Sequence, residues 1–453
     1  EAEDLLEIIE EELRNRKFAP IVRVEVGNTT SEELLHWLLG ELGVDAEKDL
    51  YRSDAPLGLN SLMEIARLDL PELHFPTHSP VSHPRLKALE SDHEGADIFS
   101  VIRRGDVLLH HPFQSFATSV LALLQAAAAD PRVLAIKHTL YRTAENSPIV
   151  SSLLMAAENG KEVNVQVEIK ARFDEMRNIE WVRKLEAAGV HVSYGFIGLK
   201  THSKTLLIVR DEPDGIRRYC HIGTGNYHTG TARLYTDVGL LTCNPEICQD
   251  VADLFNYLTG HSNFSAYRKL LVAPVNMRRR FLEMIRREIE RSTPDRPGMI
   301  FAKMNQLEDP EIIQALYMAS QAGVKIDLIV RGFCCLRPGV VGLSENIRVR
   351  AIIGRFLEHS RIYCFSNGGN EEFYIGSADW MSRNLDWRVE AITPIESPAL
   401  KKELRAILRA CWADHAQSWE LQRDGHYARR RPRRGCGSQQ TFVERYARLA
   451  GGR

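Results

Sequence analysis

The sequence predicts an α/β fold, in which two similar α/β domains follow a smaller, partial α+β domain. Three observations support this prediction. Hydrophobic residues make up 44% of the chain and charged residues 26%, which is ordinary for a globular protein. From Ser119 onward, helical periodicity alternates with short runs of β-branched and apolar residues, as in βαβ units around a buried sheet. Several distinctive segments also occur twice, at nearly one separation.

The repeat is visible in three pairs of residues. The segments VNVQVEIKAR and VKIDLIVR end 159 residues apart, the histidines of THSK and EHSR are 157 apart, and the first glycines of GTGN and GSADW are 153 apart. The pairs are Arg172 with Arg331, His202 with His359, and Gly223 with Gly376. Each repeat therefore ends one strand in arginine, opens another with His-x-Lys or His-x-Arg, and then supplies a glycine-containing turn. Independent features that share nearly one offset indicate a duplicated unit.

Residues 1–105 are interpreted as the partial α+β domain. Apolar residues between Leu5 and Leu13 recur at helical spacing, and IVRVEV (21–26) alternates like a strand. A second helix is predicted over 31–42, with Ser31 as its N-cap. Residues 57–111 are rich in loops because four prolines interrupt any long element.

The first repeat is predicted to form a domain over residues 106–275, and the second a domain over 276–424. In the first, helices are expected at 119–129, 150–159 and 178–188, and strands at 133–141, 163–169, 191–195, 205–209 and 219–223. In the second, helices are expected at 278–291 and 310–322, and strands at 298–304, 324–330, 361–365 and 373–377. Residues 425–453, which include HYARRRPRRGCGSQQ, are few in apolar side chains and are predicted to be a basic flexible tail.

The charge balance and the termini narrow the class of protein. The net charge is -2 and the pI about 6.8, so no nucleic-acid partner is expected and any anion site must be local. No apolar run approaches the roughly 20 residues that span a bilayer, and the first residues, Glu-Ala-Glu-Asp, differ from a secretory signal. The eight cysteines form no C-x-x-C pair. A cytoplasmic protein is therefore predicted, with a truncated start because no initiator Met is present.

The segment GLKTHSKTLLIVR (198–210) points to the chemistry. Residues i and i+2 of an extended chain face the same side, so His202 and Lys204 project together toward one anion. A neutral imidazole is a good nucleophile or proton carrier near pH 7, and arginine forks clamp phosphate oxygens. Glycines in GTGN let backbone N–H groups approach an oxyanion, so Gly223, Gly225 and Asn226 are candidate phosphate-binding residues. These residue types together favour phosphoryl transfer.

Longer segments carry a family resemblance. LYRT (140–143), KARFDE (170–175), GLKTHSK, HIGTGNYHTGTARLYTD (221–237), KMNQL, LIVRGFCCLRPG (328–339), EHSRIYCF and YIGSADWMSRNLDWRVE (374–390) closely resemble polyphosphate kinase of the large, phosphohistidine-forming type. The resemblance extends from the start of the chain to about residue 420. It implies a kinase that reversibly transfers the terminal phosphate of ATP to inorganic polyphosphate through a phosphorylated histidine, with ADP as the other product and Mg²⁺ as cofactor.

The resemblance also implies roles for individual residues. His202 corresponds to the histidine that carries the phosphate, with Lys204 beside it, and His359 to a second active-site histidine near the nucleotide phosphates. Tyr235 corresponds to the residue beside the adenine, and Arg331 to a nucleotide-phosphate contact. His359 either acts as a general acid or base or braces the transferring phosphate.

The resemblance further implies a Mg²⁺ and phosphate site at Arg142 and Arg172. Arginine has no lone pair to offer a metal at neutral pH, so we expect both side chains on phosphate oxygens next to the ion. Family members self-associate, so a dimer or tetramer is expected, and peripheral membrane contact is compatible with the sequence. If the front of the chain is missing, part of the nucleotide pocket is missing with it.

Two alternative functions remain. The duplicated unit is also similar to the phospholipase D architecture, whose motif is H-x-K-x4-D. Both α/β domains, 106–275 and 276–424, are therefore expected to be phospholipase-D-like, and a phosphodiesterase is the enzymatic alternative. Val209 stands at the expected aspartate position, and the second repeat has Arg361 and Ser366 where lysine and aspartate are expected. The non-enzymatic alternative is a polyanion-binding scaffold.

The other histidines and the basic helix receive structural interpretations. His110 and His111 are expected at a domain junction rather than on a metal, because adjacent side chains point apart. His191, His221 and His228 are expected to be structural or surface groups. The arginines of 278–291 alternate with glutamates, which is typical of a solvated helix face, although such a strip would also attract polyphosphate.

Overall fold

The computed structural model describes residues 19–87, 89, 97–141, 147–168, 175–195, 198–260, 266–430 and 437–451. The chain divides into two compact units, Glu1–His78 and Ser79–Arg453. The sequence placed this boundary near residue 105, because the prolines obscure the short helices α4 (Pro84–Lys87) and α5 (Ile98–Arg103). Helix α5 belongs to the second unit, since its buried Phe99 makes an edge contact with Tyr219 at 4.9 Å.

The first unit contains a small parallel pair of strands. Strand β1 (Val24–Gly27) pairs with β2 (Leu50–Ser53), and α2 (Glu32–Leu42) connects them. The predicted N-cap is confirmed: the Ser31 hydroxyl accepts a hydrogen bond from the N–H of Leu34 at 3.3 Å. The strand begins three residues later than the alternating pattern suggested, because pairing with β2 starts only at Val24. The helix predicted around 5–13 lies outside the described residues.

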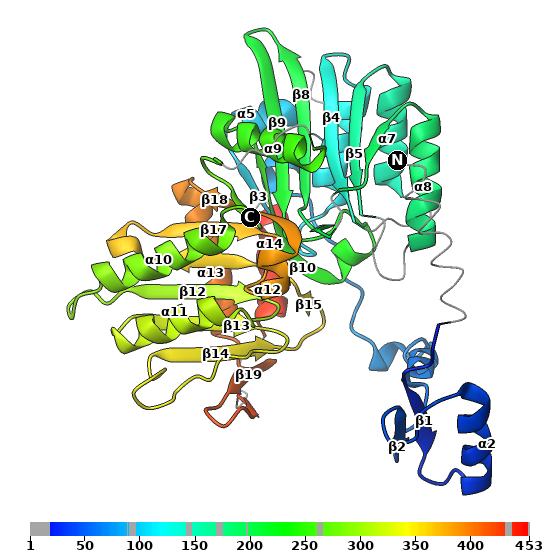
Figure 1. Cartoon of the computed structure of the whole chain (residues 1–453). Coiled ribbons are helices and arrows are strands. Elements are labelled where there is room, and N and C mark those ends of the chain that lie inside the picture. The colour runs from blue at the N-terminus through cyan, green and yellow to red at the C-terminus, as the bar shows by residue number, and fades with distance from the viewer. Residues whose placement is uncertain are drawn as a thin grey trace. The chain divides into compact units, whose positions relative to one another are not determined.

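The first half of the second unit is an α/β layer structure (Figure 1). Its elements are β3 (Val107–His111), α6 (Ala122–Ala129), β4 (Val133–Leu140), α7 (Pro148–Glu158), β5 (Glu162–Val167), α8 (Glu175–Ala187), β6 (His191–Ser193), β7 (Lys200–Thr201), β8 (Thr205–Glu212), β9 (Gly215–Gly223), β10 (Tyr235–Thr242) and α9 (Pro245–Leu258). Its described strands lie in the order β10-β9-β8-β4-β5-β6, with β3 on the other side of β10.

The second half repeats this arrangement. Its elements are β11 (Leu271–Ala273), α10 (Met277–Arg291), β12 (Met299–Met304), α11 (Pro310–Gln321), β13 (Lys325–Val330), β14 (Ile347–Ile352), β15 (Leu357–Glu358), β16 (Ile362–Phe365), β17 (Glu372–Gly376), α12 (Ser382–Asp386), β18 (Arg388–Ile395) and α13 (Pro398–Trp412). The strand order is β11-β18-β17-β16-β12-β13-β14, which matches the first half strand for strand. The predicted α/β class with two tandem, duplicated domains is therefore confirmed.

Helices cover both faces of the second sheet, as Figure 1 shows for α10 and α11 on one side. Their buried residues Phe281 and Leu316 pack with Ile300 and Leu328 of the central strands, whereas Leu404 of α13 belongs to a cluster on the opposite face. Apolar residues of both halves share this opposite-face cluster, which joins the halves into one unit. None of the described helices is long and apolar enough to cross a membrane.

The predicted flexible tail is corrected by the structure. After β19 (Ser418–Leu421) and β20 (Tyr427–Arg429), the chain forms helix α14 (Ser438–Gly451). Phe442 and Tyr446, four residues apart on one face of α14, are buried, and Tyr446 stacks on Phe113 at 6.1 Å. The arginine-rich segment before α14 lowered the apolar content of the whole region and concealed this amphipathic stripe.

Candidate active site

Two short strands are exchanged between the halves and place the histidines. Strand β7 of the first half adds in parallel to β18, and β15 of the second half adds in parallel to β10. His202 directly follows β7, and His359 directly follows β15. Each histidine therefore lies against the last long strand of the opposite half, so the duplicated sequence forms one composite site.

His202 is oriented by Glu390 of β18. Its Nδ1 lies 2.9 Å from Glu390 Oε2, and the carboxylate is wholly buried. The ring of Tyr141 stands perpendicular to the imidazole, with centroids 5.1 Å apart. Among the described residues none hydrogen-bonds to Nε2 of His202. With the proton on Nδ1 and donated to Glu390, the Nε2 lone pair is available as a nucleophile.

The surroundings keep this imidazole uncharged. Burial, followed by the positive charge of Lys204 and Arg388, lowers the pKa of His202 well below its usual value. Burial also raises the pKa of Glu390 to about 7, although Arg388 and Lys204 oppose the shift. A neutral imidazole at neutral pH is the form that attacks phosphorus.

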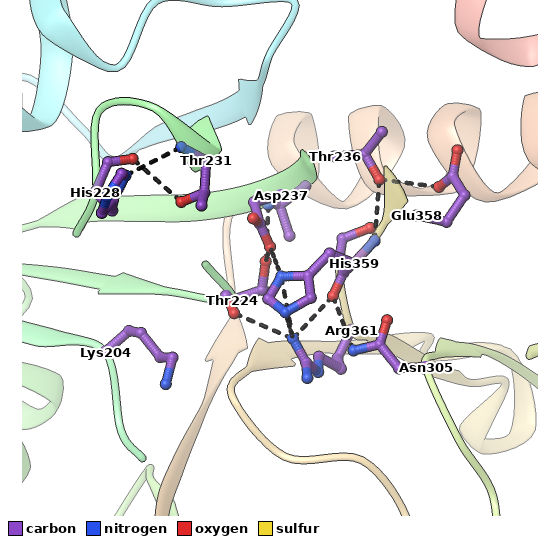
Figure 2. A network of polar contacts seen from close by, with 12 residues as sticks. Lys204, Thr224, His228, Thr231, Thr236, Asp237, Asn305, Glu358, His359 and Arg361 are labelled. Atoms are coloured by element: carbon purple, nitrogen blue, oxygen red, sulfur yellow. Dashed lines mark hydrogen bonds and ion pairs between the residues drawn. The ribbon is translucent and has the colours of Figure 1, made fainter. Parts of the chain in front are cut away.

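The second histidine has an equivalent partner in the opposite half (Figure 2). Nδ1 of His359 lies 2.8 Å from Oδ1 of Asp237, which also accepts the Thr224 hydroxyl at 2.6 Å. Burial opposes ionisation of Asp237, but the contacts with His359, Thr224 and Arg361 hold its pKa below the usual value. Burial also lowers the pKa of His359. Asp237 and Glu390 are 153 residues apart, the offset of the glycine turns.

The cations at the two equivalent positions differ in their partners. Arg361 forms a bidentate ion pair with Asp379, at 3.2 and 3.1 Å, and its Nη1 also donates to the carbonyls of His359 and Thr224. Lys204 donates to the carbonyl of His202. Burial lowers the pKa of Lys204, whereas the contacts with Asp379 raise the pKa of Arg361, so Arg361 holds its charge more firmly than Lys204 does.

Tyr235 lies next to His359, and Arg331 lies near Tyr235 and Arg361. The Tyr235 ring is tilted against the His359 imidazole, with centroids 5.2 Å apart. Burial and the neighbouring charge of Arg361 lower the pKa of Arg331. The guanidinium of Arg331 has neither a hydrogen bond nor an ion pair with any residue in the described ranges, and its Nε is buried. A half-buried cation in this state is suited to bind an anion.

The glycines of GTGN serve packing as well as backbone freedom. The N–H of Gly223 donates to the carbonyl of Lys204 at 3.0 Å and so is already satisfied. A Cβ at Gly223 would lie 2.8 Å from the ring of His221, and one at Gly225 would lie 2.2 Å from Oδ2 of Asp237. Gly225 therefore makes room for the carboxylate that supports His359, and Gly223 makes room for the buried ring of His221. Asn226 follows them, and its Oδ1 is buried without a hydrogen-bond partner among the described residues.

His191, His221 and His228 take the structural or surface roles expected of them, whereas His110 and His111 lie within the sheet of the second unit rather than at the predicted domain junction. His110 and His111 lie in β3 with their side chains on different partners: His110 on Tyr446, and His111 on the carbonyl of Gln114. His221 is buried and contacts the Tyr227 hydroxyl at 2.8 Å. His228 accepts the N–H of Gly230 and Thr231, as Figure 2 shows for Thr231. His191 is exposed.

The sequence missed both carboxylates that orient the histidines. Glu390 and Asp237 each stand in a segment of the family resemblance, RVE and YTD, and share the repeat offset, which was the signal available. The predicted Mg²⁺ residues Arg142 and Arg172 lie outside the described residues. Within the described ranges no group of three or more His, Cys, Asp or Glu side chains is arranged to hold a metal ion.

Three consecutive segments of the chain match domains of known protein families. Residues 1–65 match the polyphosphate kinase middle domain, residues 97–264 polyphosphate kinase C-terminal domain 1, and residues 270–440 C-terminal domain 2. The two C-terminal matches coincide with the two halves of the second unit. The composite site therefore lies between these two domains.

Individual relatives agree. The polyphosphate kinase of Synechocystis is 56% identical over 95% of this chain, and that of Streptomyces coelicolor is 51% identical over 95%. The matches cover 61% and 57% of those proteins, so the chain spans about three fifths of their length.

Solved structures give the same result. The crystal structure of polyphosphate kinase from Porphyromonas gingivalis superimposes with a TM-score of 0.85 at 36% identity, covering 95% of this chain and 65% of that one. Phosphatidylserine synthase of Haemophilus influenzae, with a TM-score of 0.50 at 10% identity over 81% of this chain and 98% of that one, shares the fold. By its three family matches and its close relatives, the chain belongs to the polyphosphate kinase family.

Proposed function

We propose that this chain carries the phosphohistidine centre of a polyphosphate kinase, which reversibly transfers the γ-phosphate of ATP to inorganic polyphosphate. The observation that supports this best is His202, whose Nδ1 is held by buried Glu390 while its Nε2 has no partner among the described residues. The names of the relatives point to the same activity.

The first half-reaction forms a nitrogen–phosphorus bond. Nε2 of His202 attacks the γ-phosphorus of ATP, the bond from γ-phosphorus to the bridging oxygen breaks, and ADP leaves with the electron pair. Positive charge develops on the imidazole, and the Glu390 carboxylate stabilises it through Nδ1–H. In the second half-reaction a terminal oxygen of polyphosphate attacks the phosphorus, the nitrogen–phosphorus bond breaks, and the chain is longer by one phosphate.

The surrounding cations position the phosphates. Lys204 and Arg361 flank the two histidines, and Arg331, which has no ion pair among the described residues, adds a guanidinium near Arg361 and Tyr235. His359, held through Nδ1 by Asp237, braces the transferring phosphate or exchanges a proton with it. Tyr235 presents its ring at the same side for a nucleotide base.

Mg²⁺ remains part of the proposal. Because arginine offers no lone pair to a metal, phosphate oxygens and water would be the main ligands of the ion, with Arg142 and Arg172 on neighbouring phosphate oxygens. Bound in this way, the ion would neutralise phosphate charge. Assembly into a dimer or tetramer, a cytoplasmic location and peripheral membrane contact are likewise predictions.

The decisive experiment uses γ-labelled Mg-ATP with the wild type and with His202→Ala. Protein-bound label that survives alkali and is lost in acid is expected on the wild type alone. Label that persists on His202→Ala would contradict the assignment of the nucleophile. The complete polyphosphate kinase chain should be labelled in parallel, because this chain covers only part of its relatives.

A phosphodiesterase is the second candidate, because the chain shares its fold with phosphatidylserine synthase and repeats a His-x-Lys or His-x-Arg pair. As a phosphodiesterase, this chain would cleave a diester substrate without ATP. Hydrolysis of a synthetic phosphodiester by the wild type, and its loss in His202→Ala, would favour this candidate over the kinase.

A further inference from the structure

A pocket of about 320 Å³ lined by arginines lies away from the composite site. Four arginines line it, together with the glycine turn 368–369 and one carboxylate, Glu371. The arginines are Arg291 at the end of α10, Arg296 in the following loop, and Arg405 and Arg409 on α13. Like charges around one opening repel one another and attract anions, so an anion bound there would relieve the repulsion.

The side chains around these four arginines do not neutralise all of their positive charge. Arg291 donates to the side chain of Asn367, and Arg405 pairs with Glu371. Arg296 and Arg409 are exposed and have no side-chain hydrogen bond or ion pair within the part of the chain that the structure describes. Two of the guanidinium groups that line the pocket are therefore unpaired as far as the described residues go.

The backbone on the pocket's other side is shaped to let the arginines approach. Gly368 and Gly369 have φ values of 63° and 98°, which side chains rarely adopt. A Cβ at Gly369 would lie 3.3 Å from Nη1 of Arg296, so that guanidinium rests against the turn itself.

The pocket is separate from the histidines. It adjoins Ser366, beyond the last residue of β16, whereas His359 precedes the first. The four residues of β16 alone account for roughly 13 Å between the two places. No residue that lines the pocket contacts His202, His359 or their carboxylates in the described ranges.

We infer that this arginine pocket is a second binding site for a condensed phosphate chain, distinct from the site of transfer. The choice of polyphosphate over other polyanions rests on the proposed function. Guanidinium forks match the repeated, closely spaced oxyanions of such a chain, and several can engage one ligand at once. A polyphosphate segment held there stays near the enzyme between transfers, so the pocket lengthens the product by retaining it.

The test is calorimetric titration with sodium tripolyphosphate in the His202→Ala background, which cannot transfer phosphate. Saturating ADP is added to occupy the nucleotide site. The double change Arg296→Ala with Arg409→Ala should weaken tripolyphosphate binding by at least about tenfold. Raising the salt concentration should weaken tripolyphosphate binding by the His202→Ala parent. The control, Lys402→Ala with Arg423→Ala, removes the same charge from exposed residues outside the pocket and should bind as the parent does. Equal binding by both double variants would overturn the proposal.

Two further measurements separate the possible outcomes. If ATP binds the pocket more tightly than tripolyphosphate does, as judged by competition between them, the pocket is a nucleotide site and the polyphosphate assignment is wrong. In protein with His202 intact, the arginine double variant should make shorter chains at an unchanged initial rate of ATP consumption. An inactive complete kinase chain that still binds tripolyphosphate through Arg296 and Arg409 would reject the proposed function and keep the pocket.

Discussion

The carboxylate of Glu390 lies 2.9 Å from Nδ1 of His202, although 188 residues separate the two in the chain. The same relationship joins Asp237 to His359 in the opposite direction, at 2.8 Å. Each half of the duplicated unit thus presents one histidine and orients the other. The predictions below test the consequences of this reciprocity.

Replacing Glu390 by glutamine should reduce kcat about 100-fold with little change in KM, because the amide cannot stabilise charge on the His202 imidazole. Steady-state kinetics of phosphate transfer would measure this. The matched control is Glu283→Gln, which alters an exposed glutamate of α10 and should leave kcat unchanged. A Glu390→Gln enzyme of normal kcat would show that the carboxylate only fills space.

The rate of histidine phosphorylation should rise as pH increases through about 7, where burial places the pKa of Glu390. Stability should change in the opposite sense. Between the usual glutamate pKa of 4.5 and about 7, the folded chain retains a proton that the unfolded chain has released, so the free energy of unfolding falls as pH rises. Urea unfolding across this window should show the slope in the wild type, and a weaker slope in Glu390→Gln. Parallel slopes in both proteins would exclude Glu390 as the group responsible.

Arg331→Ala and Arg361→Ala should differ in their effects. Arg331 loses no ion pair within the described ranges, so its removal should leave the melting temperature unchanged and weaken ATP binding by about tenfold, or ~1.4 kcal/mol. Arg361→Ala also breaks the bidentate pair with buried Asp379 and should lower both affinity and stability. Calorimetry with ATP and thermal unfolding would separate the two effects. A large loss of stability in Arg331→Ala would contradict its assignment as a ligand-binding cation.

Lys303→Met should destabilise the second unit by about 3–5 kcal/mol, because it leaves the nearly buried Glu358 without its ion partner. Nζ of Lys303 lies 2.9 Å from Glu358, which also anchors the exchanged strand β15. The double change Lys303→Met with Glu358→Gln should recover part of this loss. Urea unfolding of the four proteins of the cycle would measure the coupling, and additive effects would show that the pair does not interact.

Gly225→Ala should impair catalysis through Asp237. The added methyl group would lie 2.2 Å from Oδ2 of Asp237, so the carboxylate must move away from His359 at a cost of about 1–3 kcal/mol. The control is Gly40→Ala within α2, where nothing lies within 4 Å of the added carbon and where alanine should stabilise the helix by about 0.5–1 kcal/mol. Transfer rates and unfolding of both variants would test this. Full activity in Gly225→Ala would mean that His359 does not depend on the position of Asp237.

Local sequence patterns predicted the helices and strands whose apolar periodicity is regular along the chain. The helix predicted over 310–322 is α11, and the strand predicted over 324–330 is β13, each within one residue at its ends. The repeat offsets also predicted that His202 and His359 are equivalent, and the matched strand orders confirm that equivalence.

Non-local features were not predictable in the same way. The exchange of β7 and β15 involves strands of two residues, too short to leave a periodic pattern. Glu390 and Asp237 become partners of histidines only through that exchange. Helix α14 was missed because the residues that bury Phe442, such as Phe113, lie more than 300 positions earlier in the chain.

Because β7 and β15 are exchanged, the composite site can form only when both halves have folded and packed together. A fragment that ends after α9 would contain His202 and Lys204 yet lack Glu390, so the proposed nucleophile would be present without the carboxylate that orients it. Neither copy of the duplicated unit can regain independence without rebuilding the orientation of its own histidine. Selection on one histidine is therefore selection on the other copy, and the two copies are bound to evolve as a pair.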